Sequence, residues 1–346
     1  MSQIREHQAI ERVVERLTEL LDLDRTQANV RQADGDEPGV LVDLGGARFV
    51  IEWKSSGAAA SVARAIERLG SHADGSGGQA IPLVAVPFMG AAGSDRCAAA
   101  GVNWLDLSGN ARIVAPGLRV FIEGKPNLFK RRGRPSSAFA PKSSRIARWL
   151  LMHPQQPATQ REIAQATGVD EGFTSRIVSK LERDALVTRD TRGAVKVRDA
   201  DLLLDAWKEE YDFSKHRIFK GHVPARSGEE LLHSLATLLS EASIPFAVTG
   251  LSAAWALTRY AGFRIVTVYV DAPAGDRALR HLGVREGEQG ANVWLVVPND
   301  AGVFQGAAEH GGARCVHPVQ AYLDLSAHPE RAQEAAAELR SRLLKW

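Results

Sequence analysis

The chain has 346 residues, a length that allows two or three domains with hydrophobic cores of their own. Its composition is 45% hydrophobic and 24% charged, with a net charge of +2, and no apolar run approaches the roughly 20 residues that span a bilayer. The two cysteines, Cys97 and Cys315, are far apart and lack CxxC spacing, which excludes a disulfide framework and a zinc site. With no signal-peptide pattern at the start of the chain, we expect a cytoplasmic protein that does not associate with membranes.

The first 124 residues predict helices and strands that begin in the order α-β-β-β-α-β. Apolar residues at helical spacing predict an amphipathic helix over residues 4–21. Alternating or continuous apolar runs predict the strands. The predicted strands are 28–31, 39–44, 47–54, 81–86 and 102–107, and the further helices are 61–69 and 94–100. This order resembles the PD-(D/E)xK restriction-endonuclease-like fold, whose ExK element is matched by Glu52-Trp53-Lys54.

The endonuclease resemblance implies a magnesium site on neighbouring strands. Glu52 and an acid on the preceding strand would hold Mg²⁺, and Lys54, on the same strand face as Glu52, would stabilise the attacking hydroxide. The catalytic candidates are therefore Glu52, Lys54, Asp43 and Glu37, with Glu52 and Asp43 as metal ligands. The alternative is a surface Glu/Lys pair, because ExK is common by chance.

Strand register decides between these interpretations. If Gly45-Gly46 is a two-residue hairpin turn, Asp43 faces Arg48 and Gly39 faces Glu52. Asp43 would then lie four residues along the ladder from the partner of Glu52, about 13 Å at roughly 3.3 Å per residue, which is too far for one metal ion. Glu37 or its neighbour Asp36 would be the nearest substitute, whereas a wider turn or a bulge would bring Asp43 closer.

Positive charge is concentrated in the middle of the chain. Residues 125–198 have a net charge of +10, whereas residues 1–124 and 199–346 each have a net charge of −4. Such a block indicates a polyanionic partner. The segment 125–142 is predicted to be a basic linker, and its Arg-Gly-Arg-Pro core resembles an AT-hook that places arginines in a narrow minor groove. The basic residues of that core are Lys130, Arg131, Arg132 and Arg134; a solvated linker is the alternative.

Residues 143–198 predict a winged helix-turn-helix. Ser143-Ser144 begins a first helix that stops at His153-Pro154, Thr159 caps a second helix, and Gly168 marks the turn into a third. Two short alternating runs around a polar turn, within residues 186–197, then predict the wing.

The third helix has the side chains that recognition of a DNA groove requires. Phe173, Ile177 and Leu181 occupy one face at helical spacing, and small polar and basic groups occupy the other. The predicted contacts to double-stranded DNA on this helix and the wing are Thr174, Ser175, Arg176, Ser179, Lys180, Arg183 and Arg192. A module used only for protein contacts is the alternative.

The C-terminal part predicts a further α/β domain. After a helix over 202–213, the pattern predicts a helix over 229–242, a strand over 246–249, a Gly-Leu-Ser turn into a helix, and a strand over 264–271. This arrangement resembles the nucleotidyltransferase-like fold, in which the turn grips phosphate and the strand presents two carboxylates to Mg²⁺. Thr267 and Tyr269 stand where those acids are expected and only Asp271 remains, so we expect a fold without the chemistry.

The module order resembles the AbiE-type (type IV) antitoxin family. The resemblance rests on residues 143–198, on 250–271 and on the run Pro-Val-Gln-Ala-Tyr-Leu-Asp-Leu at 318–325. It implies a repressor that binds its own promoter and opposes a nucleotidyltransferase-type toxin. The chain as a whole is therefore predicted to be an α/β multidomain protein. Its predicted parts are an endonuclease-like domain (1–124), the basic linker (125–142), a winged helix-turn-helix (143–213) and a nucleotidyltransferase-like domain lacking the acidic pair (214–346).

Two functions from different classes follow. The first is a non-catalytic, antitoxin-like DNA-binding transcriptional regulator with duplex DNA and a toxin protein as partners. The second is a Mg²⁺-dependent DNA endonuclease targeted by its winged helix. No cofactor is expected in the first case, and Mg²⁺ only in the second.

Overall fold

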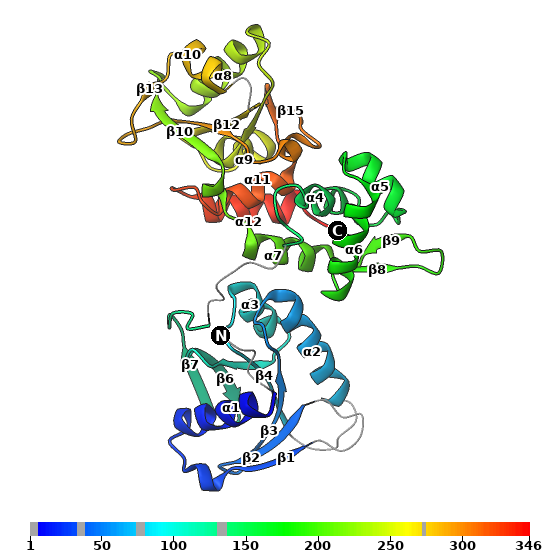
Figure 1. The fold of residues 1–346 in the computed structure, drawn as a ribbon. Helices are drawn as coiled ribbons and strands as arrows, with labels where there is room; N and C mark the ends of the chain where they lie inside the picture. Colours follow the sequence, from blue (N-terminus) through cyan, green and yellow to red (C-terminus); the bar gives the residue numbers. More distant parts are fainter. Residues whose placement is uncertain (1–5, 33–38, 74–79, 130–136, 272–274) are drawn as a thin grey trace. The chain divides into compact units, whose positions relative to one another are not determined.

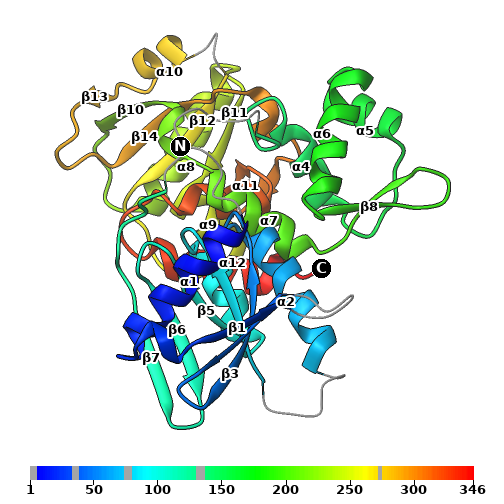
Figure 2. The same cartoon turned by 60° about the horizontal axis from the view of Figure 1, so that its bottom comes forward.

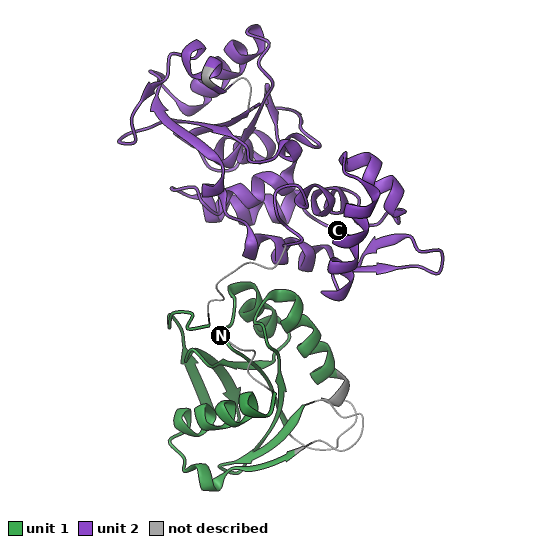
Figure 3. Cartoon of the chain, viewed as in Figure 1, with its two compact units in different colours: residues 1–135 green, residues 136–346 purple. Residues whose placement is uncertain are grey.

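The computed structural model of the 346-residue chain describes residues 6–32, 39–73, 80–129, 137–271 and 275–346. Contacts divide the chain into two compact units, residues 1–135 and 136–346, shown in different colours in Figure 3. Several predicted features lie outside the described residues: Asp36 and Glu37, and the basic run Lys130, Arg131, Arg132 and Arg134. None of the described helices is long and apolar enough to cross a membrane.

The first unit is a single sheet with helices on both faces (Figure 1). Its described strands follow one another across the sheet in chain order from β1 to β7. The strands are β1 (Asn29–Gln32), β2 (Val40–Leu44), β3 (Ala47–Trp53), β4 (Ala80–Val86), β5 (Asn103–Asp106), β6 (Ala111–Ala115) and β7 (Leu118–Ile122). The helices are α1 (Glu6–Leu20), α2 (Ala59–Ala73) and α3 (Ala91–Ala99), and a 3₁₀ turn spans Arg25–Gln27.

The core of this unit has two layers. The amphipathic stripe of α1, including Val13, Val14 and Leu17, packs on one face of the sheet against residues such as Phe49 and Ile51. The opposite face packs against α2 and α3. The alternation of strand side chains between the two faces follows from the two-residue period of a pleated strand. The sequence pattern missed the hairpin β6–β7, which extends the sheet past its last predicted strand.

The predicted register of the β2–β3 hairpin is confirmed. Leu44 pairs with Ala47 and Asp43 with Arg48, so the turn consists of Gly45 and Gly46. Both glycines have positive φ, 58° and 80°, as a tight turn between twisted strands requires. The register fixes which side chains of β2 and β3 lie beside each other.

The second unit begins with the helices and the hairpin of a winged helix. The elements are α4 (Ser144–Met152), α5 (Gln160–Thr167), α6 (Glu171–Arg183), β8 (Val187–Arg189) and β9 (Val195–Val197). Figures 1 and 2 both show β8 and β9 as a hairpin that extends beyond the three helices. A bridge between Ala158 and Val195 joins the base of this wing to the segment before α5. The helix α7 (Ala200–Glu210) follows the wing and packs against α4.

The rest of the second unit is an α/β structure around a mixed sheet. Among the described residues the strand order is β13-β10-β14-β12-β11-β16-β15. The strands are β10 (Arg217–His222), β11 (Phe246–Thr249), β12 (Val266–Val270), β13 (Arg285–Glu286), β14 (Val293–Val297), β15 (Ala308–His310) and β16 (Ala313–Cys315). The helices are α8 (Gly228–Glu241), α9 (Gly250–Thr258), α10 (Gly275–His281), α11 (Pro318–Leu325) and α12 (Ala332–Leu343), with 3₁₀ turns at Phe213–Lys215 and Ala301–Phe304.

Candidate nucleic-acid interface

The N-terminal candidates occupy separate positions on the sheet. The Asp43 carboxylate accepts from Arg48 Nε at 2.6 Å and lies 3.3 Å from Arg31 Nη2. The Arg48 hydrogen bond holds the pKa of Asp43 below its usual value. Four residues along the ladder, Glu52 is buried with 4% of its surface exposed, and its Oε1 lies 2.7 Å from Lys54 Nζ and 3.0 Å from Arg68 Nη1.

This arrangement does not fit a magnesium ion. The structure separates Asp43 from Glu52, and each carboxylate is already bound by two basic side chains. Within the described residues no group of three His, Cys, Asp or Glu side chains could hold a metal. Pairing Glu52 with Asp43 as metal ligands is therefore wrong, because the two-residue turn fixes the register that separates them. Glu37 lies outside the described residues.

A side chain of the protein occupies the space at the predicted phosphate-binding turn of the C-terminal part. Gly250, with φ 60°, begins α9, and a Cβ there would lie 2.3 Å from Nε2 of His328. Ser252 Oγ donates to the carbonyl of Thr249 and accepts from the backbone N–H of Thr267, at 2.9 and 3.2 Å. The turn therefore lies beneath a buried imidazole.

The two residues that replace the expected acids are both inaccessible. Thr267 and Tyr269, on β12, have no exposed surface. Thr267 Oγ1 lies 2.8 Å from His328 Nε2, and the Tyr269 hydroxyl lies 3.5 Å from that of Tyr211. Asp271, just beyond β12, is half-buried. Burial raises the pKa of Tyr269 well above its ordinary value, so its hydroxyl stays neutral.

Local capping positions the third helix of the winged module. Thr159 and Glu162 form a reciprocal capping box at the start of α5. The helix ends at Gly168 in the left-handed conformation, with φ 66°. Asp170 then caps α6 by accepting from the backbone N–H of Phe173 at 2.7 Å. The predicted boundaries depend on these short-range bonds, which explains why the sequence shows them clearly.

One predicted DNA contact on α6 is wrong. Thr174 is fully buried, and its hydroxyl donates to the carbonyl of Asp170 at 3.0 Å. It therefore belongs to the packed face with Ile177, Val178 and Leu181. Phe173, expected on that face, is half-buried and lies between two cations: Lys142 Nζ is 5.1 Å and the Arg176 guanidinium 5.8 Å from its ring centre.

The remaining candidates on α6 are accessible. Arg176 and Arg183 are exposed, and Ser175, Ser179 and Lys180 are half-buried. Arg176, Lys180 and Arg183 recur at intervals of four and three residues, so they form one basic stripe along the helix. This stripe is the main feature of the candidate interface.

The wing presents Arg192 at an ordered tip. Asp190 Oδ1 accepts from the backbone N–H groups of Arg192 and Ala194, at 2.9 and 2.8 Å, and the N–H of Gly193 returns to the carbonyl of Asp190. Gly193 has φ 80°, which favours glycine there. Arg192 is exposed at the turn.

Three arginines of the basic segment 125–198 bind other parts of the second unit. Arg189 Nε donates to Glu182 at 2.9 Å, which fastens β8 to α6. Arg145 makes a two-pronged ion pair with Asp300, at 2.7 and 2.9 Å. Arg148 is 2% exposed and donates to Gln320 Oε1 at 2.5 Å. The charge of the segment therefore overstates the charge that faces solvent.

Comparison of the sequence with family profiles gave two matches. Residues 140–194 match the MarR family, and residues 196–345 match the family described as "Transcriptional regulator, AbiEi antitoxin, Type IV TA system". No curated protein and no solved structure matched the chain significantly. The matches identify the functional class. The chain is a DNA-binding transcriptional regulator of the antitoxin type.

The profile matches confirm the coarse organisation and leave finer points untested. The regulator is a mixed α/β multidomain protein with a winged helix and an antitoxin domain, meaning residues 196–345. Neither match reaches the first unit, so its endonuclease-like fold stays a prediction, as do the nucleotidyltransferase-like fold and the bounds of the four predicted segments.

Sequence reasoning missed the side chains that connect the winged helix to the rest of the unit. Arg148 and Gln320 are 172 positions apart, and no spacing rule brings them together. Two features of the sequence indicate such a contact. One is an arginine on the otherwise apolar face of α4, and the other is the set of polar positions in the run 318–325. A polar group among buried apolar residues requires a partner.

Proposed function

We propose that the exposed face of α6 reads the major groove of duplex DNA while the wing contacts the adjacent backbone. The observation that carries this proposal is the basic stripe Arg176–Lys180–Arg183, which lies on the solvent side of the third helix of the helix-turn-helix. Ser175 and Ser179 lie next to the stripe, and Arg192 adds a cation at the wing tip. The proposed target is the promoter of the regulator's own operon, which makes the protein an autorepressor.

The experiment compares labelled promoter DNA with a shuffled duplex of the same length, in fluorescence anisotropy with the full chain. Arg176→Ala and Lys180→Ala should each weaken promoter binding at least tenfold, since each removes a contact to a base edge or a phosphate. Arg264→Ala is the matched control, because Arg264 lies in the antitoxin domain with 87% of its side chain exposed. Full promoter affinity in the Arg176→Ala/Lys180→Ala variant would reject the proposed face.

The antitoxin domain is proposed to be a nucleotidyltransferase-like fold that has no transferase chemistry of its own. The support is the buried pair Thr267 and Tyr269 on β12 and the imidazole of His328 over the Gly250 turn. An incubation with labelled nucleotides and Mg²⁺ should give no incorporation into RNA or protein. Incorporation that is lost in Asp271→Asn would overturn this part of the proposal.

The antitoxin domain is further proposed to oppose a nucleotidyltransferase-type toxin. The support is the family description matched by residues 196–345. The test is growth of cells that express the toxin from the neighbouring gene, with and without the regulator. Rescue by the Arg176→Ala/Lys180→Ala variant would separate toxin neutralisation from DNA binding, and absence of rescue by the wild-type chain would count against the toxin role.

The nuclease alternative concerns the first unit. It is favoured by the adjacency of Glu52 and Lys54 on one strand face, and it is opposed by the separation of Asp43 from both. We therefore propose that the first unit has a non-catalytic role within the regulator.

A further inference from the structure

The run Pro318–Leu325, which carried part of the family resemblance, forms α11 and has a structural role that its sequence does not reveal. Its polar side chains, Gln320, Tyr322 and Asp324, are all buried. They do not line a described pocket. Instead they make contacts to three other helices and a strand of the second unit.

Gln320 and Asp324 lie one turn apart and form a relay that ends on the winged helix. Arg148 Nη2 donates to Gln320 Oε1, and Gln320 Nε2 donates to Asp324 Oδ1 at 2.8 Å. Asp324 also accepts from the hydroxyls of Thr249, at 2.5 Å, and of Tyr211. The amide of Gln320 thus separates a buried cation from a buried carboxylate and hydrogen-bonds to both.

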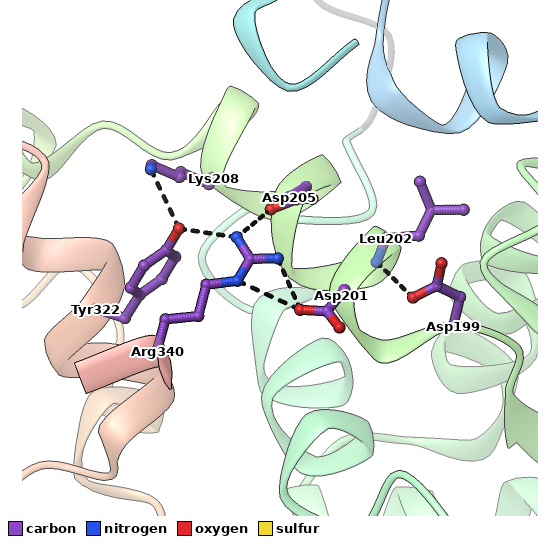
Figure 4. A network of polar contacts seen from close by, with 7 residues as sticks. All are labelled: Asp199, Asp201, Leu202, Asp205, Lys208, Tyr322 and Arg340. Carbon is purple, nitrogen blue, oxygen red and sulfur yellow. Dashed lines mark hydrogen bonds and ion pairs between the residues drawn. The ribbon is translucent and has the colours of Figure 1, made fainter. Parts of the chain in front are cut away.

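Tyr322, on the same helix, is held by a second network (Figure 4). Its hydroxyl accepts from Arg340 Nη1 at 3.0 Å and from Lys208 Nζ at 3.2 Å. Arg340, from α12, also donates to Asp201 and Asp205 of α7, at 2.7 and 2.6 Å. The helix that leads out of the wing is therefore attached to the same helix α11 as Arg148.

The relay contains a buried positive charge, the guanidinium of Arg148, that is only partly hydrogen-bonded. Arg148 lies over the ring of Trp207, and its Nε and Nη1 have no hydrogen-bond partner within the described protein. Gly302 allows this packing, because a Cβ there would lie 2.9 Å from Nη1. Burial lowers the pKa of Arg148 and raises that of Asp324 to about 6. Buried opposite charges, here joined through the Gln320 amide and not in direct contact, generally stabilise less than apolar side chains of similar volume. Their best-attested role is to specify one arrangement of the groups that they join.

The position of α4 explains why a fixed arrangement matters for DNA binding. The helix α4 packs against α5 and β9 of the winged helix, and it also packs against α7, α11 and the turn Ala301–Phe304. A small shift of α4 across the antitoxin domain would carry α5 and β9 with it, and so would move α6 and the wing relative to the antitoxin domain. The ion pair of Arg145 with Asp300 attaches the same helix one turn earlier.

We propose that Arg148, Gln320 and Asp324 are positioning residues for DNA binding, through which the antitoxin domain holds the winged helix in its DNA-competent arrangement. None of the three touches the proposed DNA face. The inference rests on the proposed function, because it requires that α6 and the wing bind DNA.

The test is a double-mutant cycle in the full chain, read out as both thermal stability and promoter affinity. Arg148→Met and Asp324→Asn should each lower Tm by about 10 °C, since each leaves one buried charge without its counter-charge. The double variant Arg148→Met/Asp324→Asn should regain a Tm within about 3 °C of wild type, because no buried charge remains. Its promoter affinity should nevertheless stay at least tenfold below wild type.

A double variant that regains both Tm and affinity would show a purely structural network and overturn the inference. Arg264→Met is the control for loss of an arginine elsewhere in the antitoxin domain and should change neither quantity. If the double variant does not fold, Asp300→Asn decides instead, since it weakens the partly buried pair with Arg145 and keeps an oxygen that can accept from the Gly302 N–H, which Asp300 caps. Folded Asp300→Asn with weakened binding supports the inference, and wild-type affinity overturns it.

The two proposals fail in different ways. Wild-type affinity in Arg176→Ala/Lys180→Ala rejects the DNA face itself. Loss of affinity in that variant, together with wild-type affinity in Arg148→Met/Asp324→Asn, rejects only the positioning role.

Discussion

At the scale of single residues, helical spacing identified most of the buried face of α6 and failed at Thr174. A helical wheel places Thr174 within the arc of the apolar residues Ile177, Val178 and Leu181, but its polar side chain suggested the solvent side. A threonine hydroxyl can, however, donate to the carbonyl four residues earlier, which allows it to be buried without an unsatisfied group. In the structure Thr174 makes this bond, and the accepting carbonyl belongs to the capping residue Asp170.

Thr174→Val should therefore behave as a core substitution. It keeps the shape of the side chain and removes one hydrogen bond, so the free energy of unfolding should fall by about 1 kcal/mol. Promoter affinity should stay within twofold of wild type. Chemical denaturation and fluorescence anisotropy measure the two quantities, with Ser175→Ala as the neighbour on the accessible face. A large loss of affinity in Thr174→Val at unchanged stability would return Thr174 to the DNA contacts.

At the scale of elements, the sequence predicted those whose boundaries depend on local bonds. The caps of α5 and α6 and the Gly45-Gly46 turn follow from bonds or conformations within four residues, and all were visible in the pattern. The hairpin β6–β7 and the short strands β13, β15 and β16 were missed. A short strand contains too few residues to show a clear alternation, and its position depends on pairing with neighbouring strands. For the same reason the attachment of α4 to α11 could not be predicted.

The cap of α11 makes a prediction about pH. His317 Nδ1 accepts from the backbone N–H of Val319 at 3.3 Å, which requires a neutral ring, and burial lowers the pKa of His317 to about 4. The unfolded chain binds this proton near pH 6.5, so the stabilisation is complete above 6.5 and is lost as pH falls towards 4. Burial also lowers the pKa values of His216 and His328 to about 4, so these two residues act in the same direction.

His317→Asn keeps an acceptor at the cap and removes the titration. Its Tm should fall less than that of wild type between pH 6.5 and pH 4.5 in thermal scans. Burial raises the pKa of Asp324 to about 6, so its protonation stabilises the fold over part of the same range and offsets some of the loss. Asp324→Asn should therefore show the steeper fall. Identical pH profiles for wild type and His317→Asn would exclude a neutral His317 cap.

At the scale of the whole molecule, the segregation of charge indicated DNA binding correctly but overstated the number of cations available to DNA. The segment 125–198 has a net charge of +10, yet Arg145 and Arg148 bind the antitoxin domain and Arg189 binds α6. The function was predictable because module order and a basic block are properties of the sequence. The number of cations available to DNA was not, because it depends on which side chains the fold turns inwards.

Salt dependence counts those cations. The slope of log Kd against log salt concentration reports the number of phosphates neutralised, and one phosphate contact changes it by about 1. Lys180→Ala and Arg183→Ala, if these residues contact phosphates, should each reduce the slope by about this amount. Arg145→Ala should leave the slope unchanged even if the affinity falls, because its guanidinium is bound to Asp300. A reduced slope in Arg145→Ala would place that residue at the DNA.

The first unit supplies the last prediction, since neither profile match covers it. The confirmed hairpin register places Asp43 beside Arg48 and leaves Glu52 bound to Lys54 and Arg68, so the described residues do not form the carboxylate pair that a metal-dependent nuclease needs. Supercoiled plasmid incubated with the full chain and Mg²⁺ or Mn²⁺ should stay supercoiled. Glu52→Ala and Lys54→Ala should keep wild-type promoter affinity, because they lie outside the winged helix. Nicking by the wild-type chain that disappears in Lys54→Ala would show that the register argument fails and that the regulator also cuts DNA.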